Sequence, residues 1–278
     1  MATNSRSEYN SSINESRYTS PQSRHAVHID ANLDTIESSH EFNSLIRDSC
    51  YEFLGTALFV YISLSGVHQA ALPTIGTTNN VDQVHVASCF AIGLTSGILL
   101  AQKSGGHLNP AVSATLWIAG EISLGRMFSY IACQLLGGFA GALGVLAIHG
   151  SRLIELRPKH ELALIGMFGT LKGDNNSLVC AIIDQFIGSA LLMVAIIATP
   201  ATPLKPIIVG GALGALGLFQ GTNGFAFNMA RDLSPRIAST ILYGAAPFAE
   251  FASWVWVPIV IPFFGVPFGF VLVQLLTM

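Results

Sequence analysis

The stretches GGHLNPAVS (residues 105–113) and GFAFNMARD (residues 224–232) decide how this chain folds. Both are apolar, both begin with glycine, and both run into a segment with the composition of a short helix. Each contains a triplet that starts with asparagine: Asn109, Pro110 and Ala111 in the first stretch, and Asn228, Met229 and Ala230 in the second. The repetition predicts equivalent structural elements in the two halves of the chain.

The helical runs that follow the asparagines, residues 110–119 and 229–243, are too short to cross a bilayer, which needs about 20 apolar residues. At a rise of about 1.5 Å per residue, a half-helix of about ten residues covers roughly 15 Å. Two of them end to end would match a hydrocarbon core of about 30 Å. Half-spans are stable at membrane depth only where their irregular backbone faces protein or a water-filled path. The two triplets therefore predict a pore.

The composition is that of a membrane protein. Of the 278 residues, 51% are hydrophobic and only 10% are charged, whereas a soluble chain carries about 25% charged residues. The formal charge of −3 provides no basic field for nucleic acid, so no nucleic-acid partner is expected. The four cysteines are spaced unlike a zinc site or a disulfide framework, and we expect neither a metal nor a cofactor.

Residues 1–47 differ in composition from the rest of the chain. They are rich in Ser, Asn, His and charged residues, and their apolar residues follow no sustained period. Such a segment cannot bury enough apolar surface to offset the loss of chain entropy on folding. We predict a mostly disordered tail, with a helical turn or two near residues 41–47. One hypothesis is that this tail covers the cytoplasmic mouth of the pore and restricts flux.

Charge-poor apolar runs predict six transmembrane helices, three on each side of a long connecting loop at residues 151–177. They cover residues 53 to about 71, 84–102, 127–149, 178–199, 207–219 and 251–276. Because three is an odd number, the second half (about 178–278) must enter the membrane from the face opposite to the first half (about 48–150). The predicted fold is an all-α membrane protein with six transmembrane helices and two re-entrant half-helices in an inverted repeat, which places a transport site at the bilayer midplane.

Each asparagine is predicted to lie at the N-terminus of its half-helix, in the middle of the membrane. There Asn109 and Asn228 can cap their helices and direct amide N–H groups into the lumen, where they donate to a passing water or hydroxyl. The positive dipole ends of the two half-helices oppose the passage of cations, protons included. Pro110 suits the first helical position, where its missing N–H would be unpaired anyway.

Arg231 is an isolated charge within an apolar segment, and charges inside a membrane are usually functional. We expect its guanidinium to line a narrow entrance, donating to solute oxygens and repelling cations, although an interfacial position is the alternative. Phe225 is predicted to form an apolar wall of the same entrance. Asp232 lies in the first helical turn and is placed to pair with Arg236 at i,i+4.

Two acidic residues, Glu52 and Asp184, lie near the starts of apolar spans. We interpret both as structural, accepting hydrogen bonds from the loop backbones that carry the two triplets. A proton-relay role is the alternative for any carboxylate within the membrane. His107 is predicted to support the loop of the first triplet.

These residues together resemble the major intrinsic protein family, the aquaporins and aquaglyceroporins, over residues 48–278. SGGHLNPAV at residues 104–112 is nearly the family's first signature, GFAFNMARDLSPR at residues 224–236 resembles the second, and EFLGT at residues 52–56 accompanies them. The resemblance implies an aquaporin-like bundle of six tilted helices, a pore in each subunit and a homotetramer. It also implies a multi-pass protein of the plasma membrane whose tail, residues 1–47, lies in the cytoplasm.

Within the family, the chain is similar to the glycerol-conducting branch. The residues that carry this likeness are Asp232, Arg236, Pro258 and Ile259. The resemblance implies a narrow filter in which Arg231 supplies the donor and Phe225 the wall. It also implies that Gly217 is the small filter residue that leaves room for a carbon backbone.

The fourth filter position is open. Counting back from Asn109 without gaps places Cys89 there, whereas glycerol channels usually carry Trp and water channels Phe. The adjacent Phe90, or Ile92 after a local gap, are the alternatives. If Cys89 lines the filter, the aperture is wider and less apolar than in a typical glycerol facilitator.

The predicted function is passive, gradient-driven passage of small uncharged solutes, glycerol and water above all, without chemistry. A water-selective or peroxide-permeable pore is the nearest alternative. A secondary transporter that uses Glu52 or Asp184 as a proton site would instead show saturable uptake coupled to pH. A non-conducting membrane scaffold is the third possibility.

Overall fold

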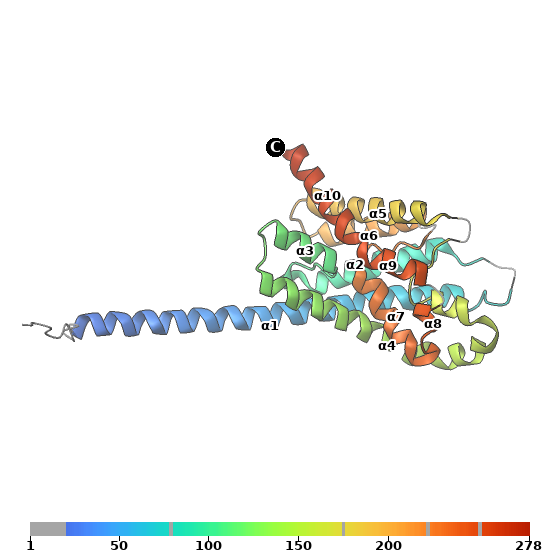
Figure 1. The fold of residues 1–278 in the computed structure, drawn as a ribbon, viewed down its shortest axis with the longest axis horizontal. Helices are drawn as coiled ribbons and strands as arrows, with labels where there is room; N and C mark the ends of the chain where they lie inside the picture. The colour runs from blue at the N-terminus through green and yellow to red at the C-terminus, as the bar shows by residue number, and fades with distance from the viewer. Residues whose placement is uncertain (1–20, 78–79, 174–175, 221–222, 250–251) are drawn as a thin grey trace, which may run out of the picture. The chain divides into compact units, whose positions relative to one another are not determined.

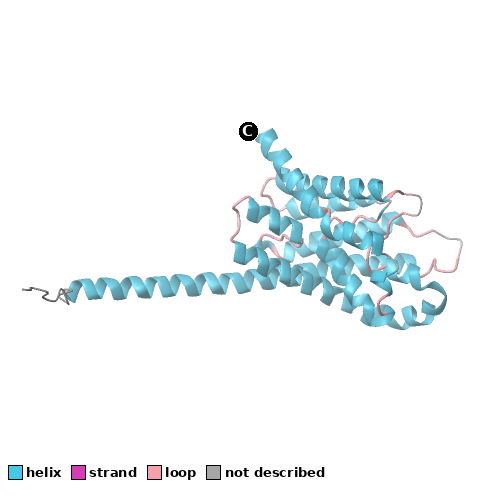
Figure 2. Cartoon of the chain, viewed as in Figure 1, coloured by secondary structure: helices cyan, strands magenta, loops and turns pink. Residues whose placement is uncertain are grey.

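The fold is given by a computed structural model that describes residues 21–77, 80–173, 176–220, 223–249 and 252–278. Throughout these ranges the regular secondary structure is helical (Figure 2). The chain divides into two compact units, residues 1–44 and residues 45–278. Within the described residues, the first unit consists of the start of helix α1 (Pro21–Ala71), and the second contains the candidate site residues.

The first helix begins much earlier than the sequence predicts. Residues 21–47 are helical, whereas we expected a mostly disordered tail with a turn or two of helix near its end. No glycine or proline occurs between residues 22 and 54, so nothing in the sequence interrupts the helix. Because elongation of an existing helix avoids the cost of nucleation, the membrane segment of α1 can continue backwards into the polar sequence. Residues 1–20 of the predicted tail lie outside the described residues.

Five helical segments of the described chain are long and apolar enough to cross a membrane. They are Glu41–Ala71 of α1, α2 (Gln83–Leu100), α4 (Leu124–Gly166), α5 (Leu178–Ala198) and Ala252–Thr277. The remaining predicted span corresponds to α6 (Lys205–Phe219), which is apolar but has only 15 residues. These helices identify an integral, multi-pass membrane protein.

The last of these segments is two helices, α9 (Ala252–Val260) and α10 (Pro262–Thr277). Pro258 and Pro262 flank the break, and proline both lacks the backbone N–H and clashes with the carbonyl of the preceding turn. Residue 251, where we predicted this span to begin, lies outside the described residues.

The prediction of a long connecting loop at residues 151–177 is wrong over its first part, because α4 continues to Gly166. The loop was predicted from its charged residues, but these alternate with Leu153, Leu164 and Ile165, which are fully buried. One face of the segment therefore belongs to the core, and its charges occupy the other face of the same helix. The helix bends at His160, whose φ of −138° is not helical, shortly after Pro158.

The two predicted half-helices are α3 (Pro110–Ile118) and α7 (Met229–Tyr243). In the second unit, α3 packs against α10 and α4, and α7 packs against α4, α8 (Ala246–Ala249) and α9. The longer helices pair as α2 with α6 and as α5 with α10, and α5 also packs against α6 (Figure 1). Each half-helix thus lies against a long helix from the other half of the sequence.

Small residues allow these helices to approach closely. A Cβ atom added at Gly137 or Gly141 of α4 would collide with the carbonyl oxygens of Phe53 and Ala57 on α1. Gly265 on α10 meets the carbonyl of Phe186 on α5 in the same way. Membrane helices associate largely through such packing, because lipid tails are as apolar as the side chains themselves.

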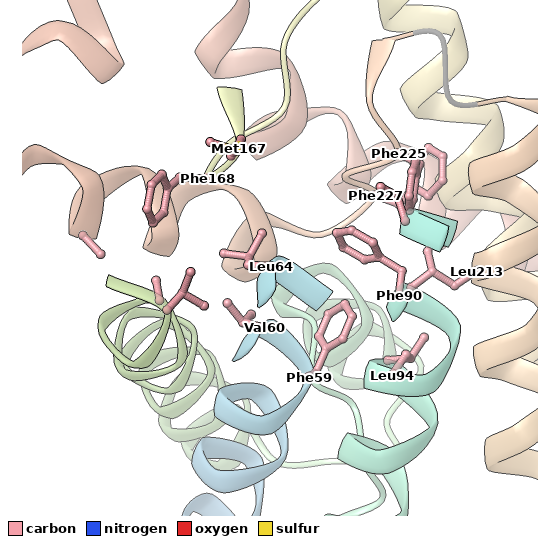
Figure 3. Packing of buried hydrophobic residues seen from close by; sticks show 14 of the residues in the cluster. Phe59, Val60, Leu64, Phe90, Leu94, Met167, Phe168, Leu213, Phe225 and Phe227 are labelled. Atoms are coloured by element: carbon pink, nitrogen blue, oxygen red, sulfur yellow. The ribbon is translucent and has the colours of Figure 1, made fainter. Parts of the chain in front are cut away.

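The largest buried cluster joins α1, α2, α6 and the segments around residues 167 and 225. Figure 3 shows its central members: Phe59, Val60, Leu64, Phe90, Leu94, Met167, Phe168, Leu213, Phe225 and Phe227. Phe90, Phe225 and Phe227 lie together at one end of this view. The second triplet, which directly follows Phe227, therefore lies at the aromatic end of this core.

Candidate pore and selectivity filter

The loops that lead into the two triplets have nearly the same backbone conformation. We call residues 105–108 the first pore loop and residues 223–227 the second pore loop. Leu108 and Phe227, which end them, both have a φ of +49°. Asn109 follows with φ −152° and ψ 119°, and Asn228 with φ −157° and ψ 116°. A left-handed conformation is costly for residues as large as Leu and Phe, so the surrounding structure must hold both loops in place.

Each asparagine caps its own half-helix. Oδ1 of Asn109 accepts from the N–H of Ala111 at 3.0 Å. Oδ1 of Asn228 accepts from the N–H groups of Ala230 at 2.9 Å and of Arg231 at 3.3 Å. A side-chain oxygen at this position satisfies backbone donors that have no partner within the helix. Pro110 and Met229 accordingly occupy the first helical positions.

The two loops are also bonded to each other through the same side chains. Nδ2 of Asn109 donates to the carbonyl oxygen of Phe227 at 2.9 Å, and Nδ2 of Asn228 donates to that of Leu108 at 2.7 Å. Each amide nitrogen carries a second hydrogen, which has no acceptor among the described residues and is available to a solute. The two half-helix N-termini therefore meet at one point, with one donor from each side.

A cavity of about 860 Å³ reaches this point. Asn109 and Asn228 lie in its lining, together with His107 and the preceding glycines of the first pore loop. Most of the other lining residues are apolar, among them Phe59, Leu94, Leu192, Val209, Leu213 and Phe270. A passage that combines a few polar groups with apolar walls suits a solute that has both hydroxyl groups and carbon atoms.

Arg231 lies in an aromatic setting next to the second triplet. Its side chain is buried, and its guanidinium carbon lies 4.5 Å from the centroid of the Phe90 ring. The Phe225 ring meets Phe90 edge-on, with centroids 4.7 Å apart. Nε of Arg231 has no hydrogen-bond partner among the described residues, and a buried unpaired donor costs free energy until a ligand or water accepts from it.

Gly217 completes this group, which we call the filter cluster: Arg231, Phe90, Phe225 and Gly217. A Cβ atom added at Gly217 would lie 2.9 Å from Cζ of Phe225. The glycine on α6 thus provides the space that the Phe225 ring fills.

The structure places Phe90, rather than Cys89, beside Arg231. Cys89 packs against Gly66 of α1, where an added Cβ would collide with the cysteine side chain. Ile92 is 58% exposed. Successive helical residues differ in direction by about 100°, so an error of one residue in the count from Asn109 selects a side chain on a different face of α2.

Glu52 of α1 lies beneath the first pore loop. Its Oε1 accepts from the N–H of His107 at 3.0 Å, and its Oε2 accepts from the N–H of Leu108 at 2.8 Å. Gln134 of α4 also donates to Oε2, at 2.8 Å. Nδ1 of His107 is 3.0 Å from Oγ of Ser113 on α3. Glu52 and His107 therefore join the first pore loop to α1 and to α3.

In the second half, Gln185 makes the contacts that we expected of Asp184. Nε2 of Gln185 donates to the carbonyl of Gly224 at 2.6 Å, and its Oε1 accepts from the N–H of Phe227 at 3.3 Å. The carboxylate of Asp184 accepts instead from the side chain of Asn223, at 3.1 Å. The role of Gln185 was not predicted, although the repeat indicates it: Gln185 directly precedes a phenylalanine, as Glu52 does in the first half.

The family model described as "Major intrinsic protein" matches residues 38–272. The chain belongs to the major intrinsic protein family.

Several members of this family are similar to the chain over most of their length. Aquaglyceroporin-3 of Trypanosoma brucei brucei is 33% identical, covering 80% of this chain and 76% of the relative. The glycerol uptake facilitator protein of Pseudomonas aeruginosa is 31% identical, covering 81% of this chain and 87% of the relative. The X-ray structure of the aquaglyceroporin from Plasmodium falciparum superimposes with a TM-score of 0.73 at 27% identity, covering 81% of this chain and 93% of that chain.

In this major intrinsic protein, Asp232 and Arg236 form a fully buried ion pair on α7. The contact between Nη2 and Oδ1 measures 3.0 Å, and both side chains are fully buried. Thr170 donates to the carboxylate from its N–H at 2.7 Å and from its hydroxyl at 2.6 Å. Its carbonyl accepts from Arg236 at 2.8 Å and from Nε1 of Trp254 at 2.8 Å. The pair thus ties the segment after α4 to α7 and α9, which also carries the buried Pro258.

Ile259, the other predicted marker on α9, is partly buried next to Pro258. Of the residues named from the sequence, the structure brings Arg231, Phe225 and Gly217 together with Phe90, one of the alternatives for the fourth position. It assigns Asp232 and Arg236 to the neighbouring ion pair. Thr170 and Trp254 were missed, because neither contact follows from spacing along one helix.

Proposed function

We propose that this protein is a passive channel for glycerol and water. The observation that carries the proposal is the meeting of Asn109 and Asn228, each bonded to the loop of the other and each with a free amide hydrogen at the end of the cavity. The relatives support the same reading, since one is named a glycerol uptake facilitator and others are named aquaglyceroporins.

Passage would proceed by exchange of hydrogen bonds. A solute hydroxyl gives up water and accepts from the amides of Asn109 and Asn228, while the carbons of the solute contact apolar residues such as Leu94 and Leu213. The N-termini of α3 and α7 point toward this position from opposite sides, and their positive dipole ends disfavour cations and protons. A neutral polyol loses little on entry, because each hydroxyl exchanges one partner for another.

The filter cluster would select the solute. Arg231 donates to solute oxygens, and Phe90 and Phe225 provide apolar surface for the carbon chain. The Phe90 ring beneath the guanidinium fixes its position without using its N–H groups, since the interaction is with the ring face. The alternative of a water-selective or peroxide-permeable pore is less favoured, because the cluster has one strong donor and two aromatic walls.

A proton-coupled transporter is less favoured, because its candidate proton sites, Glu52 and Asp184, are both engaged in hydrogen bonds. Both carboxylate oxygens of Glu52 accept hydrogen bonds, two of them from backbone N–H groups of the first pore loop. The Asp184 carboxylate is bonded to Asn223, outside the lining of the large cavity. Groups held in this way are suited to support a loop.

The finer architecture belongs to the same proposal. We infer six membrane crossings, with α6 as the short one, and two re-entrant half-helices in an inverted repeat. The assembly would be a homotetramer in the plasma membrane, with the N-terminus in the cytoplasm. The packing of α3 against α10 and of α7 against α4 supports the repeat.

Stopped-flow light scattering on proteoliposomes tests the function, with water and glycerol gradients applied to the same preparation. We expect rapid entry of both solutes, linear in the gradient and indifferent to a pH gradient. The variant Arg231→Ala should change the relative rates. Saturable, pH-coupled uptake would support a transporter, and identical rates in empty liposomes would support a scaffold.

A further inference from the structure

A chain of hydrogen bonds continues from Glu52 to the start of α4. Oγ of Ser104 donates to Oε1 of Glu52 at 2.6 Å. The carbonyl of Ser104 accepts from the hydroxyl of Tyr130 at 3.0 Å, and that hydroxyl accepts from Nη1 of Arg126 at 3.2 Å. The same nitrogen of Arg126 forms an ion pair with Oδ2 of Asp48.

Tyr130 and Asp48 are held in place by burial, whereas Arg126 is partly exposed. Tyr130 is 1% exposed and Asp48 is 5% exposed. The second carboxylate oxygen of Asp48 accepts from Nε of Arg47 at 2.9 Å, so both oxygens are engaged. A tyrosine hydroxyl has one hydrogen, and Arg126 can only donate. Arg126 therefore obliges the hydroxyl of Tyr130 to direct its hydrogen at Ser104.

Ser104 directly precedes the part of the first pore loop that lines the cavity. Gly105 and Gly106 follow with φ values of 98° and 62°, a region that glycine enters freely. Both glycines and His107 lie in the cavity lining. Because two adjacent glycines have a large conformational freedom, the directions of their polar groups depend on what holds the loop at its two ends.

Glu52 contacts both ends of the loop, but only the Ser104 end is also bonded to Tyr130. Glu52 binds the N–H groups of His107 and Leu108 at the end next to Asn109. At the other end, the carbonyl of Ser104 is fixed by Tyr130, and through it by Arg126 and Asp48. The second pore loop is held otherwise, by Gln185 on α5.

The geometry points to Tyr130, Arg126 and Asp48 as a positioning unit for the first pore loop, one that determines how well the channel discriminates between polyol and water. This inference rests on the proposed function. None of the three lies in the cavity lining, so they act through Ser104 and the two glycines. A polyol needs several correctly placed partners at once, whereas a water molecule exchanges one or two at a time. Misplacing the loop therefore slows glycerol more than water.

The test compares glycerol and water permeability in the same proteoliposomes by stopped-flow light scattering, and the readout is their ratio. The number of folded channels cancels in this ratio, so a purely structural defect leaves it unchanged. We expect Tyr130→Phe and Arg126→Gln each to lower the ratio about fivefold, the size of effect that the loss of one net hydrogen bond produces. Arg126→Lys, which retains the charge opposite Asp48, should keep most of the glycerol-to-water ratio of the unaltered protein.

Tyr61→Phe is the matched control. Tyr61 lies on α1 and is partly buried, and its hydroxyl makes no hydrogen bond with the described part of the chain. Its ratio should equal that of the unaltered protein. If Tyr130→Phe does not reach the membrane, Arg126→Gln decides. An unchanged ratio in conducting variants overturns the positioning role, whereas an unaltered protein that conducts neither solute overturns the channel function itself.

Discussion

The guanidinium carbon of Arg231 lies 4.5 Å from the centroid of the Phe90 ring. The two residues come from α7 and α2, and 140 residues separate them in the sequence, as their numbers show. The contact holds a buried cation over an aromatic face and keeps its N–H groups available, an interaction worth about 0.5–2 kcal/mol. It also places Phe90 next to the guanidinium, whereas Cys89 packs against Gly66.

Replacing Phe90 by alanine should widen the filter. The variant loses the ring that faces Arg231 and Phe225, so we expect a longer polyol such as erythritol to enter several times faster relative to glycerol. Stopped-flow measurements with both solutes give this ratio. Cys89→Ala is the matched control, and it should behave as the unaltered protein does. If Cys89→Ala alone raised the rate of erythritol entry relative to glycerol, Cys89 and not Phe90 would occupy the fourth filter position.

Gly217→Ala should narrow the same filter. The added Cβ would lie 2.9 Å from Cζ of Phe225 and must push the ring. We expect glycerol permeability to fall by about tenfold, a barrier increase of about 1.4 kcal/mol, while water is affected less. Gly211→Ala on the same helix is the control, because an added Cβ there meets nothing within 4 Å. Equal effects of the two substitutions would argue against a filter at Gly217.

Gln185→Glu should make permeation depend on pH. The amide of Gln185 donates to the carbonyl of Gly224, which an ionised carboxylate cannot do. The charged form places an oxygen against an oxygen, so the second pore loop should shift and flux should fall at neutral pH. Protonation in acid restores a donor, and flux should recover as the pH is lowered.

The neighbouring substitution Asp184→Asn serves as the control for this pH profile, since Asp184 accepts from the side chain of Asn223 and does not contact the carbonyl of Gly224. Permeability measured from pH 7 downward should be flat for this variant. A flat profile for Gln185→Glu as well would show that Gln185 does not hold the second pore loop.

Arg236→Ala should destabilise the folded protein strongly. The substitution leaves Asp232 charged and unpaired in a fully buried position, and breaking a buried pair in this way typically costs about 3–5 kcal/mol. Thermal unfolding in detergent should therefore begin at a clearly lower temperature. Arg152→Ala removes a pair whose side chains are 50% and 65% exposed and should have little effect. Comparable losses from both substitutions would contradict a structural role of the Asp232–Arg236 pair.

Membership of the major intrinsic protein family could be predicted from the sequence, and it is confirmed. The membrane setting could be predicted as well, because apolar runs of sufficient length are a property of the sequence itself. Two of the corrections concern helix boundaries. Residues 21–47 and 151–166 are helical despite their polar composition, since helix elongation and one-sided burial both tolerate charges on an exposed face.

Interactions that span a single turn of helix could be predicted from the sequence. The caps formed by Asn109 and Asn228, and the pair of Asp232 with Arg236 at i,i+4, follow from spacing alone. Three other contacts could not be predicted in this way: Phe90 faces Arg231, Gln185 holds the second pore loop, and each asparagine bonds the opposite loop. These contacts depend on the rotation and register of packed helices, where a shift of one residue turns a side chain by about 100°.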